Sequence, residues 1–325
     1  MYKLLDELFP FVLFFIGFVV IIKGSDIFID SAIWFARITK IPDLIIGATL
    51  VSLGTTLPEL MVSAGAAMQG NTEIAIGNAL GSIICNTGLI LAIIIIISRP
   101  KFTDKKEFQQ NGILLMLLLM LIAFVSFVYG EISRFTGAIL LGILIWYLYK
   151  NIKNSIYNNK TVHNKIKGEK NISTKIITLN LLMFCIGLAL TILGAKLLIT
   201  NGEKIAIFLG VSDVIIGLTL TAFGTSLPEL MASITALRKK VYDISLGNIL
   251  GANILNIILV IAVSSTILPI PIGSNILYLH LPFVLLIVSI TLLFSFICKN
   301  TFYRRCGFIM VIAYINYLLF TFDLF

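Results

Sequence analysis

The chain has 325 residues, of which 58% are hydrophobic and 12% are charged, and its mean hydropathy is +1.04. This composition excludes a soluble globular domain and predicts an integral membrane protein. The apolar runs are too long for the tilted strands of a membrane barrel and lack their alternation, so we expect helical spans. The formal net charge of +8 is typical of cytoplasmic loops rich in lysine and arginine, and we expect no nucleic-acid partner.

Hydrophobic stretches bounded by charged residues or by glycine and proline predict ten transmembrane helices. We expect them near residues 9–36, 43–68, 73–98, 111–130, 133–150, 176–200, 213–237, 243–267, 276–297 and 305–322. The first five form one repeat (1–150) and the last five another (176–325), separated by a basic cytoplasmic linker (151–175). Because each repeat has an odd number of spans, the second lies upside down in the membrane. The predicted fold class is an all-α integral membrane protein of two inverted five-helix repeats, with broken helices at their shared motifs.

The distribution of lysine and arginine predicts the orientation of the chain in the membrane. With the N-terminus outside, nineteen basic residues fall in cytoplasmic segments and three, Lys3, Arg134 and Lys204, fall outside. The opposite orientation would reverse this bias. We therefore expect a multi-pass protein of the cell membrane with both termini outside, in contact with the lipid bilayer and functional as a monomer.

The two halves share a segment at a fixed shift of 170 positions. GATLVSLGTTLPELMVS (47–63) returns as GLTLTAFGTSLPELMAS (217–233), and about half of the positions between 43 and 86 equal their counterparts, which indicates a duplicated unit. Further repeat-related pairs are Asp43 with Asp213, Gly77-Asn78 with Gly247-Asn248, Gly81 with Gly251, and Asn86 with Asn256. The repeat places one intramembrane glutamate in each half, Glu59 and Glu229. Two helix-breaking segments in corresponding places indicate the binding site of a transporter.

A proline in each copy predicts a break in the helix, because proline removes a hydrogen bond and frees backbone carbonyls. Inside a membrane those carbonyls need another partner, and a bound cation is one of the few available. Carboxylate, hydroxyl and carbonyl oxygens are hard donors that suit sodium, calcium or magnesium and disfavour zinc or copper. Calcium takes about six to eight oxygens. Glu59 and Glu229, with carbonyls near Thr55 and Thr225, would supply a largely dehydrated shell that favours calcium over magnesium.

The alternative interpretation of the glutamates is structural pairing with a buried lysine. Lys23 and Lys196 lie near span ends, but neither recurs at the repeat shift, and Asp26 aligns with Lys196. A carboxylate in mid-span costs at least about 2.5 kcal/mol on insertion scales, so we expect both glutamates to bind cargo. The recurring Asn86 and Asn256 each offer a neutral oxygen to the same region.

The paired motifs GTTLPEL with IGNALGSIICN and GTSLPEL with LGNILGANILN resemble the two alpha-repeats of the sodium/calcium exchanger family, in the calcium/cation antiporter superfamily. The resemblance implies four cation sites between the second, third, seventh and eighth spans, and a first and sixth span that slide as a gate. It implies that the two glutamates coordinate calcium together with the carbonyls of Thr55 and Thr225. The sodium ligands that it implies are the same glutamates with Ser52 (carbonyl), Thr56, Ser82, Ala222 (carbonyl), Thr225 and Ser226, while Asn86 and Asn256 line the middle position.

Two residues depart from the family pattern. Asn256 stands where many prokaryotic relatives have aspartate, and asparagine there resembles the potassium-independent exchangers. Ala252 stands where the family usually has a serine whose hydroxyl helps to hold one sodium. The sodium stoichiometry is therefore left open.

The predicted function is a secondary antiporter that exchanges sodium for calcium by alternating access, with electrogenic extrusion of calcium. Two carboxylates balance one calcium or several monovalent cations, so the site holds either cargo, as antiport requires. The alternative is a proton-coupled calcium or cation antiporter, because two close carboxylates also carry protons.

Other classes have less support in the sequence. A cation channel would need a continuous pore, usually lined by oligomeric rings, whereas this chain has one internal pair of repeats. We expect no enzyme and no cofactor, because His163 and His280 lie near no nucleophile motif and there is no phosphate loop. The four cysteines have no metal-ligand spacing and are expected to be reduced packing residues.

Overall fold

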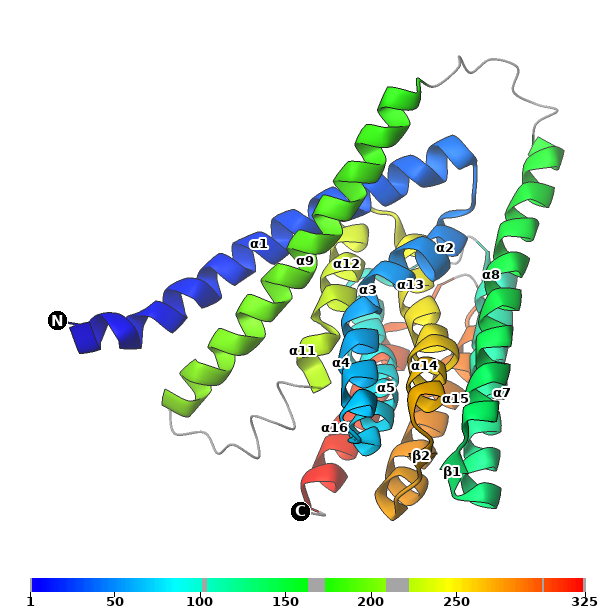
Figure 1. Cartoon of the computed structure of the whole chain (residues 1–325). Coiled ribbons are helices and arrows are strands. Elements are labelled where there is room, and N and C mark those ends of the chain that lie inside the picture. The colour runs from blue at the N-terminus through cyan, green and yellow to red at the C-terminus, as the bar shows by residue number, and fades with distance from the viewer. Residues whose placement is uncertain (1, 101–103, 163–172, 209–221, 300, 324–325) are drawn as a thin grey trace.

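A computed structural model describes residues 2–100, 104–162, 173–208, 222–299 and 301–323. For residues 2–8, 154–162, 222–223 and 322–323 it gives the backbone alone. The described part is almost entirely helical (Figure 1). It contains one short antiparallel pair of strands, in which Glu131–Ile132 (β1) pairs with Ile270–Pro271 (β2).

The described elements fall into two halves with similar helices around the repeated motif. Those of the first half are α1 (Tyr2–Thr39), α2 (Asp43–Ile46), the π-helical η1 (Gly47–Val51), α3 (Ser52–Thr55), α4 (Leu57–Met68), α5 (Thr72–Cys85), the π-helical η2 (Asn86–Leu91), α6 (Ala92–Ser98), α7 (Lys105–Tyr129) and α8 (Arg134–Val162). Those of the second half are α9 (Thr174–Phe208), α11 (Ala222–Thr225), α12 (Leu227–Arg238), α13 (Tyr242–Leu255), the π-helical η4 (Asn256–Ile261), α14 (Ala262–Ile267), the π-helical η5 (Ile276–His280), α15 (Leu281–Ile297) and α16 (Arg304–Asp323).

Seven helices within the described residues are long and apolar enough to cross a membrane, or up to eight if the bent pair Asp43–Thr55 and Leu57–Met68 is one span. Ten spans and their inverted arrangement stay a prediction. The span expected at 213–237 begins among residues 209–221, outside the described part, as do Asp213 and the start of the second repeat motif. The helix α16 coincides with the tenth expected span.

Several helices extend beyond the expected spans, among them α1, which begins at Tyr2, and α7, which begins at Lys105. The extensions of α8 and α9 are the longest. The helix α8 continues through Asn151 to Val162, into the segment expected as a linker at 151–175. This part contains neither glycine nor proline, so nothing in its sequence ends the helix. The helix α9 continues to Phe208, past the expected end at residue 200. His163 lies among residues 163–172, outside the described part.

The long helices α1 and α9 cross each other at one side of the helix bundle (Figure 1). Their backbones approach closely at glycines. A methyl group in place of the Gly24 hydrogen would lie 2.6 Å from the amide nitrogen of Thr191, and one at Gly194 would lie 2.5 Å from that of Ile21. These two contacts are related by the shift of 170 positions.

A second pair of glycines repeats this relationship further along the crossing. A methyl group at Gly187 would lie 2.5 Å from the amide nitrogen of Phe28, and one at Gly17 would lie 3.1 Å from that of Leu198. A residue of α1 contacts α9, and the equivalent residue of α9 makes the equivalent contact with α1. Such reciprocal contacts are typical of two copies related by a twofold axis. The crossing of α1 and α9 therefore follows the repeat symmetry.

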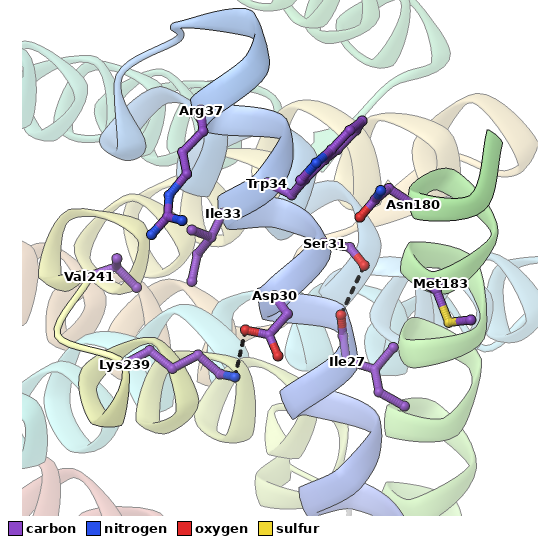
Figure 2. A pocket seen from close by; sticks show the side chains of 10 residues that line it. All are labelled: Ile27, Asp30, Ser31, Ile33, Trp34, Arg37, Asn180, Met183, Lys239 and Val241. Atoms are coloured by element: carbon purple, nitrogen blue, oxygen red, sulfur yellow. Dashed lines mark hydrogen bonds and ion pairs between the residues drawn. The ribbon is translucent and has the colours of Figure 1, made fainter. Parts of the chain in front are cut away.

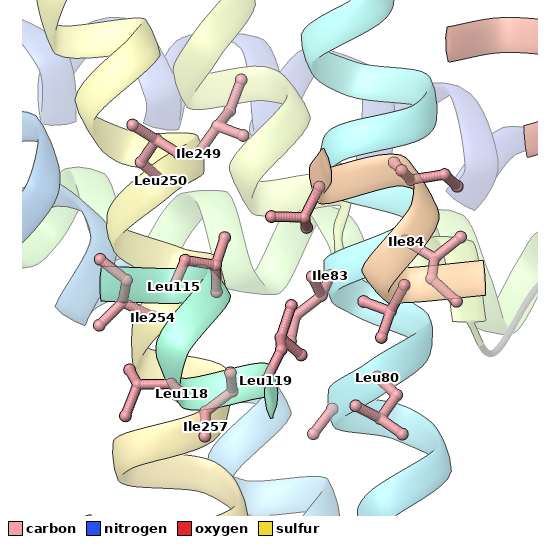
Figure 3. Close-up of a cluster of buried hydrophobic side chains, with 14 of the residues drawn as sticks. Leu80, Ile83, Ile84, Leu115, Leu118, Leu119, Ile249, Leu250, Ile254 and Ile257 are labelled. Atoms are coloured by element: carbon pink, nitrogen blue, oxygen red, sulfur yellow. The ribbon is translucent and has the colours of Figure 1, made fainter. Parts of the chain in front are cut away.

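The largest cluster of buried apolar side chains joins α5, α7 and α13 at the centre of the bundle (Figure 3). It includes Leu80 and Ile83 of α5, Leu118 of α7, and Leu250 and Ile254 of α13. Since α5 and α13 occupy corresponding places in the two repeats, this packing fixes one repeat against the other. The motifs next to these helices are therefore held on a packed core.

Apolar side chains also cover the outside of the bundle. On α1, Phe15 and Val19 are exposed, and on α9 Leu182 and Leu193 are exposed. A soluble protein does not expose contiguous apolar faces of this kind. The outer surface is suited to the hydrocarbon of a bilayer.

Candidate cation site

The helix break expected from the proline is present in both repeats. In the first, α3 ends at Thr55 and α4 begins at Leu57, and the two segments are bent by 45°. In the second, α11 ends at Thr225 and α12 begins at Leu227. Because proline at the second position of α4 and α12 has no N–H, the carbonyl four residues earlier loses its usual donor.

Each break places a glutamate in the first turn of the helix that follows. Glu59 lies in the first turn of α4 and Glu229 in that of α12, and both side chains are completely buried. The Glu229 carboxylate is close enough to that of Glu59 to interact with it electrostatically. The N-terminal end of a helix is favourable for negative charge, which helps both helices to accommodate a carboxylate.

Among the residues that the structure describes, the carboxylates of Glu59 and Glu229 make no well-formed hydrogen bond and have no basic side chain within 4 Å. The polar side chains that interact with them are Ser82, near Glu59, and Thr55, near Glu229. Structural pairing with Lys23 or Lys196 therefore finds no support. A buried carboxylate without a partner is strongly disfavoured unless it takes up a proton or a cation. The two glutamates therefore form a pair of carboxylates that can hold a cation.

Further unpartnered oxygens lie at the two helix breaks, in α5, and at the start of η2 and η4. The side-chain oxygens of Thr56, Ser226 and Ser82 are buried and make no hydrogen bond within the described ranges. The amide groups of Asn86 and Asn256 are also buried without a partner there. All five of these residues were expected as ligands. Their oxygens are uncharged, so the site combines two carboxylates with neutral donors.

Asn86 and Asn256 occupy the same position in the local backbone. Asn86 begins the π-helical turn η2 and Asn256 begins η4. A π-helical turn inside an α-helix is rare and occurs mostly at functional sites. This feature recurs at the repeat shift, and sequence patterns did not reveal it.

The remaining expected ligands are backbone carbonyls. Ser52 lies in α3, and its carbonyl accepts the amide of Thr56 (2.9 Å). The Thr55 hydroxyl lies 3.4 Å from the same carbonyl but has a nearer acceptor in Asn248 Oδ1 (3.1 Å). A sodium ion at this carbonyl would have to share it with the amide of Thr56. Ala222 begins α11, where the backbone alone is described.

Two asparagines that the expected ligand set omits also lie at the site. Asn78 of α5 and Asn248 of α13 contact the carbonyls of the two glutamates and a threonine of the opposite repeat. The signal that could have found them is their recurrence at the repeat shift, in Gly77-Asn78 and Gly247-Asn248. Sequence spacing alone cannot show that their side chains cross between the repeats.

Ala252 lies in α13, completely buried, at the position that corresponds to Ser82. The hydroxyl that the first repeat offers is therefore missing from the second. Next to it, Asn253 donates from Nδ2 to the Thr87 hydroxyl (2.7 Å), a bond that has no counterpart in the other repeat. The two halves of the site are similar but not equal.

The histidine and the cysteines play no part in this donor set. His280 Nδ1 lies 2.8 Å from the Tyr317 hydroxyl. All four cysteines are free thiols; Cys85, Cys298 and Cys306 are buried, as expected of packing residues, whereas Cys185 is exposed. Within the described ranges no three or more histidine, cysteine or acidic side chains gather where they could hold a metal. The site is one of two carboxylates and neutral oxygens.

The sequence matches the profile of the family described as "Sodium/calcium exchanger protein" over residues 9–153 and 179–322. The chain belongs to the sodium/calcium exchanger family. It is therefore a transporter and not an enzyme. The two matched segments coincide with the two halves of the chain and leave the basic segment between them unmatched.

This member of the sodium/calcium exchanger family is similar to other prokaryotic membrane proteins over nearly its whole length. It is 36% identical to an uncharacterised membrane protein of Methanocaldococcus jannaschii, over 93% of this chain and 94% of that protein. It is 29% identical to the sodium/calcium exchanger MaX1 of Methanosarcina acetivorans, over 95% of this chain and 97% of that protein.

Solved structures of the sodium-calcium exchanger NCX_Mj have the same fold. In crystals soaked with zero Na⁺ and Ca²⁺, that exchanger superposes with a TM-score of 0.82 at 33% identity, over 96% of this chain and 98% of that one. Soaked with Na⁺ and Sr²⁺, it gives a TM-score of 0.81 at 32% identity, over 95% and 97%. The fold of this family member is that of an exchanger.

Proposed function

We propose that this protein is a secondary antiporter that exchanges Na⁺ for Ca²⁺ by alternating access around Glu59 and Glu229. The observation that carries this proposal is the pair of completely buried carboxylates, unpartnered among the described residues, at repeat-related helix breaks. The names of the relatives MaX1 and NCX_Mj, both sodium/calcium exchangers, support it. Na⁺ and Ca²⁺ are cargo, and the exchange needs no cofactor.

The calcium site that we propose joins the two repeats. The carboxylates of Glu59 and Glu229 bind the ion, and the carbonyls of Thr55 and Thr225 complete the shell with water. Calcium accepts about six to eight oxygens in flexible geometry, which two bidentate carboxylates and carbonyls can provide. One Ca²⁺ neutralises both carboxylates, so a filled site carries no net charge from these groups.

Sodium competes for the same carboxylates in this proposal. The sodium ligands are the two glutamates with Thr56, Ser226, Ser82, Thr225 and the carbonyls of Ser52 and Ala222, while Asn86 and Asn256 line the middle position. The buried, unpartnered oxygens of Thr56, Ser226, Ser82, Asn86 and Asn256 support this assignment. Because both cargoes need the same anionic groups, binding of one excludes the other.

Alternating access requires that part of the molecule move relative to the site. We propose that α1 and α9 slide together across the bundle, because their crossing is made of small residues in close backbone contact, whereas α5 and α13 lie in the packed core. The exchange of contacts between these helices supports inverted repeats. We place the protein in the cell membrane as a monomer with both termini outside.

The direction of transport follows from charge. If three Na⁺ enter for each Ca²⁺ that leaves, one net positive charge moves inward in each cycle. A potential that is negative inside contributes about 2.3 kcal/mol per charge per 100 mV, and it then drives extrusion of calcium. Two Na⁺ for each Ca²⁺ would make the exchange electroneutral.

The test is uptake of calcium-45 into proteoliposomes loaded with sodium and diluted into sodium-free or sodium-containing buffer, with a proton ionophore present. We expect uptake only when the sodium gradient is directed outward. Calcium uptake that does not depend on the sodium gradient, but is driven by a pH gradient once the ionophore is omitted, would assign the protein to the proton-coupled antiporters instead.

A further inference from the structure

Two asparagines connect the repeats immediately beside the glutamates. Asn78 lies in α5 and Asn248 in α13, at positions related by the shift of 170. Neither belongs to the ligand set that we propose for the cations. The side-chain nitrogen and oxygen of both make hydrogen bonds, in contrast to those of Asn86 and Asn256.

The donor and the acceptor in each hydrogen bond of Asn78 can be assigned. Its Nδ2 donates to the Glu59 carbonyl (3.3 Å) and to the Ser63 hydroxyl (2.9 Å), and its Oδ1 accepts from the Thr225 hydroxyl (3.3 Å). The orientation of the amide is determined, because the Glu59 carbonyl can only accept. The Ser63 hydroxyl passes its proton to the carbonyl of Ala75 (3.2 Å). Thr225 must therefore be the donor to Asn78.

The contacts of Asn248 are the same with the repeats exchanged. Its Nδ2 donates to the Glu229 carbonyl (3.4 Å) and to the Ser233 hydroxyl (3.2 Å), and its Oδ1 accepts from the Thr55 hydroxyl (3.1 Å). Each amide thus binds the glutamate segment of its own repeat and the threonine of the other. Bonds that exchange in this way are typical of a twofold interface.

We propose that Asn78 and Asn248 are positioning residues that couple the two halves of the cation site. The inference rests on the proposed function, in which Thr55 and Thr225 supply carbonyls to the calcium held by the two glutamates. Each amide is a rigid plane, so it fixes the glutamate segment on its donor side relative to the threonine on its acceptor side. A calcium ion bound between the repeats then meets ligands that are already aligned.

The same bonds orient the threonine hydroxyls. A hydroxyl that donates its proton to an asparagine oxygen cannot turn that proton toward a cation. Its oxygen lone pairs stay available to the site. Both consequences lower the reorganisation that cation binding requires.

The competing explanation is that these bonds only pack α4 against α5 and α12 against α13. Within-repeat packing is carried by the bonds to Ser63 and Ser233, whereas coupling is carried by the bonds to the threonines. The two roles can therefore be separated by substitution. Thr225→Val removes the hydroxyl that bonds Asn78 and keeps the shape of the side chain, while Thr225→Ser retains the hydroxyl.

The experiment uses the full chain in proteoliposomes and in detergent. Apparent KM and maximal rate for calcium are measured for Asn78→Ala, Thr225→Val, Thr225→Ser, Ser63→Ala and the double variant Asn78→Ala/Thr225→Val. In detergent, the rise in melting temperature on adding Ca²⁺ or Na⁺ alone reports binding without transport. Asn316→Ala is the matched control, because the Asn316 amide is exposed and bonds only its own helix at the Ile312 carbonyl.

We expect Asn78→Ala and Thr225→Val each to raise the apparent KM for calcium about tenfold, because each leaves a buried polar group unsatisfied. The double variant should be no worse than either single one, since both remove one bond. Thr225→Ser should raise the KM less than Thr225→Val does, because serine keeps the hydroxyl that bonds Asn78. Ser63→Ala should lower the melting temperature with a smaller change in KM. Asn248→Ala and Thr55→Val should show the same pattern.

Two results would overturn the proposal. One is a lower melting temperature of the ion-free protein with an unchanged KM in Asn78→Ala and Thr225→Val, which means packing alone. The other is full additivity in the double variant. Failure of the proposed function would give a different result, because the wild-type protein itself would then show no sodium-driven calcium uptake. The ion-induced shifts in melting temperature would still report whether the asparagines position a cation site.

Discussion

Lys239 Nζ lies 2.7 Å from Asp30 Oδ1 and 4.0 Å from Asp26 Oδ1, which connects the C-terminal end of α12 to the C-terminal half of α1. The adjacent Arg238 lies 3.8 Å from Asp26. Figure 2 shows the Lys239–Asp30 pair at the wall of an open pocket that Trp34 and other residues of α1 and α9 also line. These ion pairs link α1, which we propose to move during transport, to α12, which carries Glu229.

The ion pairs exist in one repeat only. At the shift of 170 positions, Asp30 corresponds to Thr200 and Lys239 corresponds to Gln69. The equivalent contact between α9 and α4 therefore cannot form an ion pair. This difference between the repeats gives the C-terminal half of α1 an attachment that its counterpart in α9 lacks.

Lys239→Ala should have a small effect on the stability of the protein and a larger effect on its transport rates. A partly exposed ion pair contributes about 0–1 kcal/mol, so we expect a fall in melting temperature of no more than about 4 °C. If α1 leaves α12 during transport, the rates of calcium uptake from the two sides should change by different factors. The measurement is initial calcium-45 uptake and efflux in oriented proteoliposomes.

The control for this variant is Lys299→Ala, which removes an exposed positive charge elsewhere on the protein. The exchanged pair Asp30→Lys with Lys239→Asp should recover wild-type behaviour. Equal effects of Lys239→Ala and Lys299→Ala would show that net charge matters and the pair does not.

Glu59→Gln and Glu229→Gln should each abolish calcium transport and leave the protein folded. Glutamine keeps the shape of the side chain and removes a buried charge that has no protein partner among the described residues, so the melting temperature of the ion-free protein should hold or rise. The measurement is calcium-45 uptake together with melting in the absence of ions. Glu73→Gln, at an exposed residue of α5, is the control; wild-type uptake in either site variant would contradict the assigned role.

Ala252→Ser should increase the number of sodium ions exchanged for each calcium. The added hydroxyl would stand where Ser82 stands in the first repeat, and it adds a neutral oxygen without charge. We expect the reversal potential of the variant to fit one more Na⁺ per Ca²⁺ than that of the wild-type protein. Ser82→Ala should have the opposite effect, and unchanged reversal potentials in both variants would exclude a sodium role for these positions.

Gly24→Ala should slow transport and destabilise the protein by about 1–3 kcal/mol. The new methyl group would lie 2.6 Å from the amide nitrogen of Thr191, so α1 and α9 must separate. Gly142→Ala in α8 is the matched control, because nothing lies within 4 Å of the added methyl group among the described residues. Replacement of a helical glycine by alanine there should stabilise the protein by about 0.5–1 kcal/mol.

Gly24→Ala and Gly142→Ala are compared by thermal melting and by the maximal rate of calcium uptake. Opposite shifts in melting temperature are expected. A wild-type rate in Gly24→Ala would show that the close crossing of α1 and α9 is not needed for exchange.

The chemistry of the site follows from local sequence. Hydropathy determines which segments enter a bilayer, and a proline in mid-span determines where a helix must break, whatever lies around it. Glu59 and Glu229 could therefore be predicted as site residues from the amino-acid sequence, and Asn86 and Asn256 from their recurrence at the repeat shift. These properties depend on a residue and its immediate neighbours along the chain.

The pairing of the two halves was decided by tertiary structure. The bond from Thr225 to Asn78 and the ion pair of Lys239 with Asp30 join residues far apart in the chain. Such contacts depend on how the helices dock, and hydropathy allows many dockings. A repeat shift predicts which residues are equivalent; only the packed fold shows that an asparagine of one repeat holds the threonine of the other.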